Sequence, residues 1–162
     1  MIDDNISYDP KTGELSYLVT QGRVPEDRIC RSKDTHGYIR VSYKGKRYLG
    51  HRVAYYLMMG SWPLGDIDHI NGIRDDNRWE NLRVSTRSQN LWNQECTRGS
   101  SKYKGVYRQK NRWIAQLSLA GGYLGSFTCE REAALAYNHA AQPIFGIHGR
   151  YNQVFEDIDE LC

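Results

Sequence analysis

Residues Asp66 to Asn93 read D-I-D-H-I-N-G-I-R-D-D-N-R-W-E-N-L-R-V-S-T-R-S-Q-N-L-W-N, and the rest of the chain is arranged around them. Its opening residues alternate between polar and apolar as a short strand does, and Asn71-Gly72 is a strong hairpin-turn signal. A second apolar stretch around Leu82 follows, and the segment ends in a short polar helix for which Ser85 or Thr86 is a suitable N-cap. The pattern predicts the order strand, turn, strand, helix.

Four polar residues in this stretch have the chemistry of a metal-assisted hydrolytic site. Asp68 and His69 are adjacent, Asn81 follows twelve residues after His69, and Asn90 follows nine residues after Asn81. Asp68 and Asn90 offer hard oxygen ligands of the kind that Mg²⁺ or Mn²⁺ prefers. His69 suits a general base, with Asn81 accepting a hydrogen bond from its other ring nitrogen. The alternative is an ordinary hairpin with polar residues at its tip, but four such residues together favour a site.

The D-H pair, the E-N-L triplet and the final asparagine, at these spacings, resemble the HNH (ββα-metal) nucleases, in the phage homing type where asparagine replaces the last histidine. The resemblance implies His69 as general base, Asn81 as the residue that orients it, and Asp68 with Asn90 as ligands of one divalent cation per active site. It implies cleavage of duplex DNA to 5′-phosphate and 3′-hydroxyl ends. Asn90 in place of histidine leaves the identity of the ion open.

Composition restricts the class of protein. The chain has 162 residues, a formal net charge of +3, 25% charged residues and 12% aromatic residues, and two small modules suit that length. No segment has the apolar length of a membrane span, and the N-terminus lacks the pattern of a signal peptide. We therefore expect a cytoplasmic protein, in a bacterial host cell if it is phage-encoded, with no membrane partner. The four cysteines have no C-x-x-C spacing, so we expect free thiols and no structural zinc.

Residues 5–50, before the metal motif, form a β-rich leader, and one helix follows it. Turn chemistry near Asp9-Pro10 and a hairpin over 37–49 predict short strands, and residues 51–60 predict a helix that stops at Gly60. His51, at the start of that helix, is either a third histidine of the site or a structural residue. Its role stays open.

The second half of the chain predicts a sheet with one helix. After a polar linker at 95–101, strands are expected at 103–108, 112–119 and 123–127, and a helix capped by Thr128 is expected over 128–141. The helix should cover the apolar face of the sheet and leave the other face polar and open. Residues 100–150 carry seven basic and two acidic groups, which suits a polyanion-binding module.

This half resembles the AP2 DNA-binding domain through K-Y-K-G-V-Y-R, R-W-I-A-Q-L, Y-L-G-S-F and E-A-A-L-A-Y-N-H-A-A, along nearly all of residues 102–152. The resemblance implies a three-stranded sheet that lies in the major groove and reads bases. The residues it places toward the groove are Lys104, Tyr107, Gln109, Arg112, Gln116, Ser118 and Tyr123. The alternative is a small sheet with a helix that binds no DNA.

The sequence thus predicts an α+β protein. A ββα-metal nuclease module with a β-rich leader would span 1–94, with its metal motif at 66–93. A three-stranded antiparallel sheet packed on one helix would span 102–152, and an acidic tail would follow at 153–162. We expect a metal-dependent homing-type endonuclease whose partner is double-stranded DNA. It would be a monomer or homodimer with no obligatory protein partner. A non-catalytic DNA-binding regulator with an HNH fold is the alternative, and an RNA or nonspecific nuclease is a third hypothesis.

Overall fold

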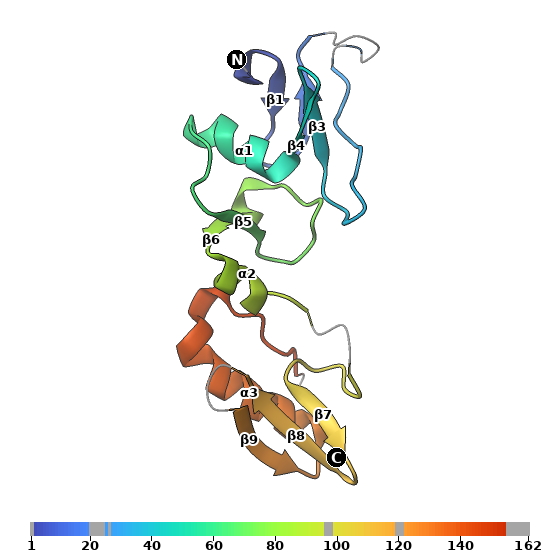
Figure 1. The fold of residues 1–162 in the computed structure, drawn as a ribbon, viewed down its shortest axis with the longest axis vertical. Helices are drawn as coiled ribbons and strands as arrows, with labels where there is room; N and C mark the ends of the chain where they lie inside the picture. The colour runs from blue at the N-terminus through green and yellow to red at the C-terminus, as the bar shows by residue number, and fades with distance from the viewer. Residues whose placement is uncertain (1, 20–24, 26, 96–98, 119–121, 155–162) are drawn as a thin grey trace. The chain divides into compact units, whose positions relative to one another are not determined.

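The computed structural model describes residues 2–19, 25, 27–95, 99–118 and 122–154. These residues divide into two compact units, the first ending at Asn90 and the second starting at Leu91. Small sheets and a few helices occur in both units, which confirms the α+β class (Figure 1). The assignment of a nuclease module to 1–94 and of a DNA-reading module to 102–152 stays a prediction. No helix in the described ranges is long and apolar enough to cross a membrane.

The first unit contains three pairs of short strands and one longer helix, and a short second helix crosses the boundary at Asn90 into the second unit. In chain order the elements are the 3₁₀ turn η1 (Ile2–Asp4), strands β1 (Ile6–Tyr8), β2 (Leu15–Tyr17), β3 (Arg40–Tyr43) and β4 (Lys46–Leu49), helix α1 (Gly50–Met59), strand β5 (Asp66–His69), the 3₁₀ turn η2 (Trp79–Asn81), strand β6 (Leu82–Ser85) and helix α2 (Arg87–Trp92). Each sheet is an antiparallel pair, β1 with β2, β3 with β4, and β5 with β6. The predicted hairpin over 37–49 and the predicted helix over 51–60 are confirmed within a few residues.

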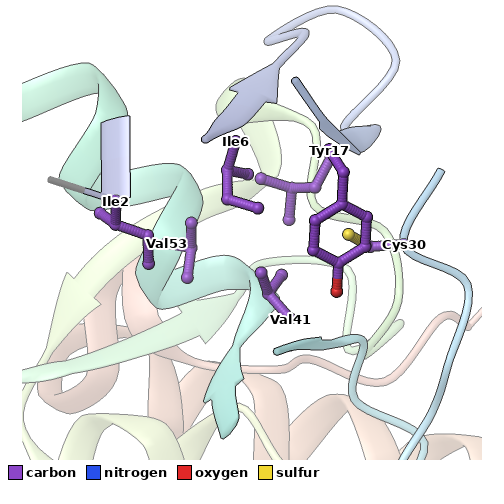
Figure 2. Close-up of a cluster of buried hydrophobic side chains, with 7 residues drawn as sticks. Ile2, Ile6, Tyr17, Cys30, Val41 and Val53 are labelled. Carbon is purple, nitrogen blue, oxygen red and sulfur yellow. The ribbon is translucent and has the colours of Figure 1, made fainter. Parts of the chain in front are cut away.

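The core of the first unit brings the leader and α1 together. Side chains from η1, β1, β2, β3 and α1 meet in one apolar cluster, drawn in Figure 2, whose buried members are Ile2, Ile6, Leu15, Tyr17, Cys30, Val41 and Val53. Burial of this apolar surface is the main free-energy term that holds the leader against α1. The leader is therefore an integral layer of the first unit.

The predicted order of strand, turn, strand and helix in the metal motif is confirmed, with one difference at the turn. Gly72 N–H donates to the carbonyl of His69, so a turn follows the histidine directly. However, the turn at Asn71-Gly72 does not connect β5 to its partner strand as a two-residue hairpin loop would. β5 pairs with β6, with His69 opposite Leu82, and residues 70–81 form the connection. Thr86 caps α2, because its Oγ1 accepts from the backbone N–H of Gln89 while Gln89 Oε1 accepts from that of Thr86.

The second unit has a three-stranded antiparallel sheet in the order β7 (Val106–Gln109), β8 (Arg112–Leu117) and β9 (Gly122–Phe127), followed by helix α3 (Glu130–Phe145) and the 3₁₀ turn η3 (Gly146–His148). Figure 1 shows α3 running along one side of the sheet. Small residues of α3, Ala133 and Ala134, pack with Val106 and Ala115 of the sheet in a shared core. The close approach that alanine allows brings the helix near the strands.

Three expectations are corrected in the second unit. The N-cap of α3 is Cys129 rather than Thr128, and no side chain caps it. Cys129 is disulfide-bonded, so the expectation of four free thiols is wrong at that position, although Cys30 is a free, buried thiol. Helix α3 also extends through Pro143 to Phe145, beyond the predicted end at 141. Cys96, Leu119, Cys162 and the acidic tail from 155 onward lie outside the described residues.

A glycine in the leader makes a close contact that has a measurable consequence. Gly13 has φ +78°, and a Cβ there would lie 2.5 Å from the backbone nitrogen of Arg78 and 2.6 Å from the carbonyl carbon of Asn77. We expect Gly13→Ala to lower the free energy of unfolding by about 3 kcal/mol, from the strained φ and from the displaced backbone. Gly45→Ala is the matched control, because Gly45 has φ +74° and nothing lies within 4 Å of its Cβ position. Denaturant unfolding of both variants should give a loss of about 1 kcal/mol for the control, and equal losses would contradict the prediction.

Candidate active site

His69, the last residue of β5, is 4% exposed, and the preceding Asp68 is 5% exposed. The Nε2 atom of His69 lies 3.1 Å from Oδ1 of Asn77, a residue of the connection between β5 and η2. The rings of His51 and Tyr38 flank it, with ring centroids 5.0 and 5.9 Å away. The fold thus brings an imidazole, an amide and two further rings together in one cluster.

Burial and neighbouring groups act in opposite directions on the imidazole of His69. Removal from water lowers the pKa of His69, whereas the hydrogen bond with Asn77 and the negative charges of Asp68 and Asp76 raise it. Burial is the largest of these effects and the pKa stays below its ordinary value, so the ring is neutral at pH 7. A neutral imidazole is the form that accepts a proton.

His51 lies in the same cluster, at the second position of α1. Its ring meets the ring of His69 at 86° and that of Tyr38 at 61°. Its Nδ1 atom is buried without a hydrogen-bond partner. Burial, followed by repulsion from His69 in its protonated form, lowers the pKa of His51 to about 3. His51 is therefore a neutral ring that packs against His69.

Asn81 does not take the place expected for it beside the imidazole. Its Oδ1 accepts from the backbone N–H of Asn71, at 2.9 Å, and its Nδ2 donates to the backbone carbonyl of Asp76, at 2.7 Å. These bonds tie together the two ends of the connection that follows His69. The contact with the ring is made by Asn77 instead, which corrects the expectation that Asn81 accepts from His69.

Asp68 is paired with an arginine on the neighbouring strand. β5 and β6 place Arg83 directly opposite Asp68, and Nε and Nη2 of Arg83 donate to Oδ2 of the carboxylate at 2.9 and 2.7 Å. The ion pair is almost fully buried, so its two charges interact strongly. Arg83 was not singled out from the sequence, although the register of the strands places it there.

The residues expected to hold a cation are Asp68 and Asn90. Nε and Nη2 of Arg83 both donate to Oδ2 of Asp68, and a carboxylate can accept about four hydrogen bonds or metal contacts in all. Asn90 lies half-buried in α2, five residues beyond the end of β6. Within the described ranges no group of three or more His, Cys, Asp or Glu side chains could hold a metal. Two hard oxygens suit Mg²⁺ or Mn²⁺, which keep several waters, and a shared ion stays a prediction.

In the second unit, one face of the sheet carries most of the residues expected to contact DNA. The strand pairs Gln109 with Arg112 and Gln116 with Tyr123 lie directly opposite each other and are exposed, as is Tyr107. Ser118 is exposed just after β8. This set, Tyr107, Gln109, Arg112, Gln116, Ser118 and Tyr123, is called the polar sheet face below.

Lys104 is not part of that face. Its ammonium group donates to the backbone carbonyls of Trp92 and Gln94, at the end of α2. Positive charge at a helix C-terminus satisfies carbonyls that have no partner within the helix. The lysine therefore has a structural role within the second unit, and its contact with DNA stays a prediction.

One protein family matches the segment that contains the candidate site. Residues 48–91 match the sequence model of a family described as HNH endonuclease, and the match includes His51, Asp68, His69, Asn81 and Asn90. A solved structure titled "DNA binding and cleavage by the HNH homing endonuclease I-HmuI" aligns with 56% of this chain and 51% of that chain, at 24% identity and a TM-score of 0.41.

Part of the chain is also similar to plant transcription factors. The AP2-like ethylene-responsive transcription factors AIL7 and AIL6 of Arabidopsis thaliana are each 44% identical over 62 residues, which is 35% of this chain and 12% and 11% of those proteins. PLT2 of the same plant is 42% identical over 62 residues and is covered to 11%. The chain thus spans about one ninth of the length of these relatives.

Proposed function

We propose that the protein is a metal-dependent endonuclease of the homing type, which hydrolyses a phosphodiester bond in duplex DNA and leaves 5′-phosphate and 3′-hydroxyl ends. The observation that carries the proposal is the neutral, buried imidazole of His69 beside Asp68, inside the segment that matches the HNH endonuclease family. An imidazole held in this form can remove a proton from a water molecule that attacks phosphorus.

The residues of the site divide the work. His69 takes the proton from water, and its ring is hydrogen-bonded to Asn77 and packed against His51. Asp68 and Asn90 are the residues that would hold one divalent cation, Mg²⁺ or Mn²⁺, which when bound supplies stabilisation of the negative charge on the phosphate and on the leaving oxygen. Arg83 orients the Asp68 carboxylate from the neighbouring strand.

The second unit is proposed to supply affinity and choice of sequence. Its polar sheet face is open on the side of the sheet away from α3, and the major groove of DNA admits a small sheet whose side chains read base edges. The partial similarity to AP2-like transcription factors supports a DNA-binding role for part of the chain.

Incubation of the full chain with Mg²⁺ and long duplex DNA tests the proposal. Sparse, reproducible cuts that carry 5′-phosphate, and that disappear when EDTA is added, are the expected result. A continuous smear of fragments would contradict targeting by the second unit. Intact DNA under all divalent-ion conditions would contradict the endonuclease.

Intact DNA combined with tight duplex binding would support the second candidate, a non-catalytic DNA-binding regulator. One observation favours that candidate: Arg83 already neutralises Asp68, and a guanidinium at the carboxylate competes with a cation for the same charge. A cleavage assay separates the two functions directly, because both require DNA binding and only one requires turnover.

The polar sheet face gives a prediction for affinity. Gln116→Ala should weaken binding to the target duplex by about 10-fold, because one good side-chain contact to a base is worth about 1–3 kcal/mol. Tyr123, which is 66% exposed, should show a similar loss when changed to alanine. Gln142→Ala is the matched control, since Gln142 is an exposed glutamine on α3. Gel-shift titrations at one fixed salt concentration measure the change, and equal affinities for Gln116→Ala and Gln142→Ala would exclude a role for this face.

A further inference from the structure

Asn77 is an unusual member of the interior of the first unit. The largest fully buried side chains of the described residues are Ile6, Leu15, Val41, Val53 and Asn77, of which four are apolar. A buried amide costs free energy unless it is hydrogen-bonded. The 3.1 Å contact of its Oδ1 with Nε2 of His69 supplies such a bond.

The position of Asn77 is fixed by elements far away in the sequence. The hydroxyl of Tyr8, in β1, donates to the backbone carbonyl of Asn77 at 2.7 Å. Burial raises the pKa of Tyr8 to about 12, so this hydroxyl keeps its proton and remains a donor at neutral pH. Gly13, in the turn between β1 and β2, lies against the backbone of Asn77 and Arg78. The leader therefore supports the residue that contacts the imidazole.

The start of α1 closes the other side of the amide. A Cβ at Gly50 would lie 3.2 Å from Nδ2 of Asn77 and 3.1 Å from the side chain of Ile39. Nδ2 therefore lies toward Gly50, and Oδ1 lies toward His69. Three segments of the chain, the leader, the start of α1 and β5, thus restrict how the amide can turn.

The orientation of the amide has a chemical consequence for the ring. An amide oxygen only accepts hydrogen bonds, and a neutral imidazole has one N–H and one lone pair. We infer that Asn77 is the positioning residue for the proposed hydrolysis: its Oδ1 accepts from Nε2–H of His69, which fixes the ring and keeps the basic lone pair on Nδ1. The inference rests on the proposed function and assigns to Asn77 the role that the HNH resemblance implies for Asn81.

The same arrangement gives the leader a function. The β1–β2 turn and Tyr8 hold the backbone that carries Asn77, and Asn77 holds the tautomer of His69. By contrast, the side chain of Asn81 bonds only to backbone atoms of the segment that connects β5 to β6. For histidines that ligate a metal, removal of the group that orients the imidazole through its second nitrogen commonly lowers activity 10- to 100-fold, and we expect a loss of this size for His69.

Two variants of Asn77 separate positioning from packing. Asn77→Leu has nearly the same shape but no acceptor, and it should lower the cutting rate by about 10- to 100-fold. Asn77→Asp keeps an acceptor oxygen at the same place, and it should retain more than a tenth of the wild-type rate. Duplex affinity should stay within a few fold in both variants, because Asn77 is 2% exposed and so offers almost no surface to DNA.

Nuclear magnetic resonance of the full chain with ¹⁵N-labelled histidine reads the tautomer without any turnover. The protein has five histidines, and the resonances of His69 are identified by their loss in His69→Gln. At pH 8 the wild-type ring should carry its proton on Nε2, and Asn77→Leu should show a mixture or the Nδ1–H form. A wild-type ring with the proton on Nδ1 overturns the inference, even if no variant of Asn77 folds.

The outcomes also distinguish this inference from the proposed function. If wild-type protein fails to cut DNA, the proposed function fails, and the NMR result still decides whether Asn77 sets the tautomer. If wild-type protein cuts and Asn77→Leu cuts equally well with an unchanged Nε2–H tautomer, the inference fails and the proposed function stands. Thermal unfolding of each variant shows whether a lost rate reflects a lost fold.

Discussion

Cleavage of duplex DNA by His69→Ala is expected to fall by about 10²- to 10⁴-fold, the range that a general base contributes, while duplex affinity changes by no more than a few fold. The reason is that His69 is the buried, neutral base at the end of β5, and it is 4% exposed, so it offers almost no surface to DNA. Initial rates at saturating DNA with Mg²⁺, compared with gel-shift titrations without a divalent ion, measure the two effects separately.

Two further variants control for the loss of a buried ring. His69→Gln keeps a polar side chain of similar length without a basic nitrogen, and it should cut as poorly as His69→Ala. His139→Ala removes an exposed histidine of α3 in the second unit and should cut at the wild-type rate. Normal cutting by His69→Gln would show that another group removes the proton, and His69 would then have no catalytic role.

Local patterns in the sequence were sufficient to predict most of the strands and helices. The alternation in 37–49 and the apolar spacing in 51–60 predicted β3, β4 and α1, and Thr86 was identified as a possible cap of α2. These signals depend on residues within a few positions of one another, so the sequence contains them directly. The same holds for the three strands and the helix of the second unit.

The side-chain partners in the candidate site were not predictable in the same way. Asn77 lies in a stretch, D-D-N-R, whose composition indicates only a loop, and its contact with His69 depends on the leader and α1 closing around it. The task of Lys104 depends on carbonyls at the end of α2, ten or more residues earlier in the chain. Arg83 is the exception, because pairing β5 with β6 in register places it opposite Asp68.

In the second unit the largest effect on stability is expected at Gly105. This residue precedes β7, has φ +72°, and its carbonyl accepts from the backbone N–H of Gln116 at 2.7 Å. A Cβ at this position would collide with the ring of Tyr137 on α3 and lie 2.6 Å from the carbonyl oxygen of Gln116. Tyr137 is buried, so its ring has little room to move.

Gly105→Ala should therefore destabilise the second unit by about 3 kcal/mol or more, the sum of a strained φ and an overpacked core. Gly122→Ala is the control with the same kind of backbone, since Gly122 has φ +88° and its nearest neighbour, Nε2 of Gln116, would lie 3.7 Å away. That variant should lose only about 1 kcal/mol. Hydrogen exchange of β7, β8 and β9 amides in the full chain measures the local opening free energy of each variant.

The two units have separate apolar cores, so the effect of Gly105→Ala should be confined to one of them. Amides of β1–β5 should exchange as in the wild type, while those of β7–β9 lose protection. Because the polar sheet face is carried by the same strands, duplex affinity should fall together with that protection, and residual cutting should lose its reproducible sites. Unchanged protection in β7–β9 would mean that the contact of Gly105 with Tyr137 relaxes easily. Unchanged duplex affinity despite lost protection would show that the second unit does not contribute to DNA binding.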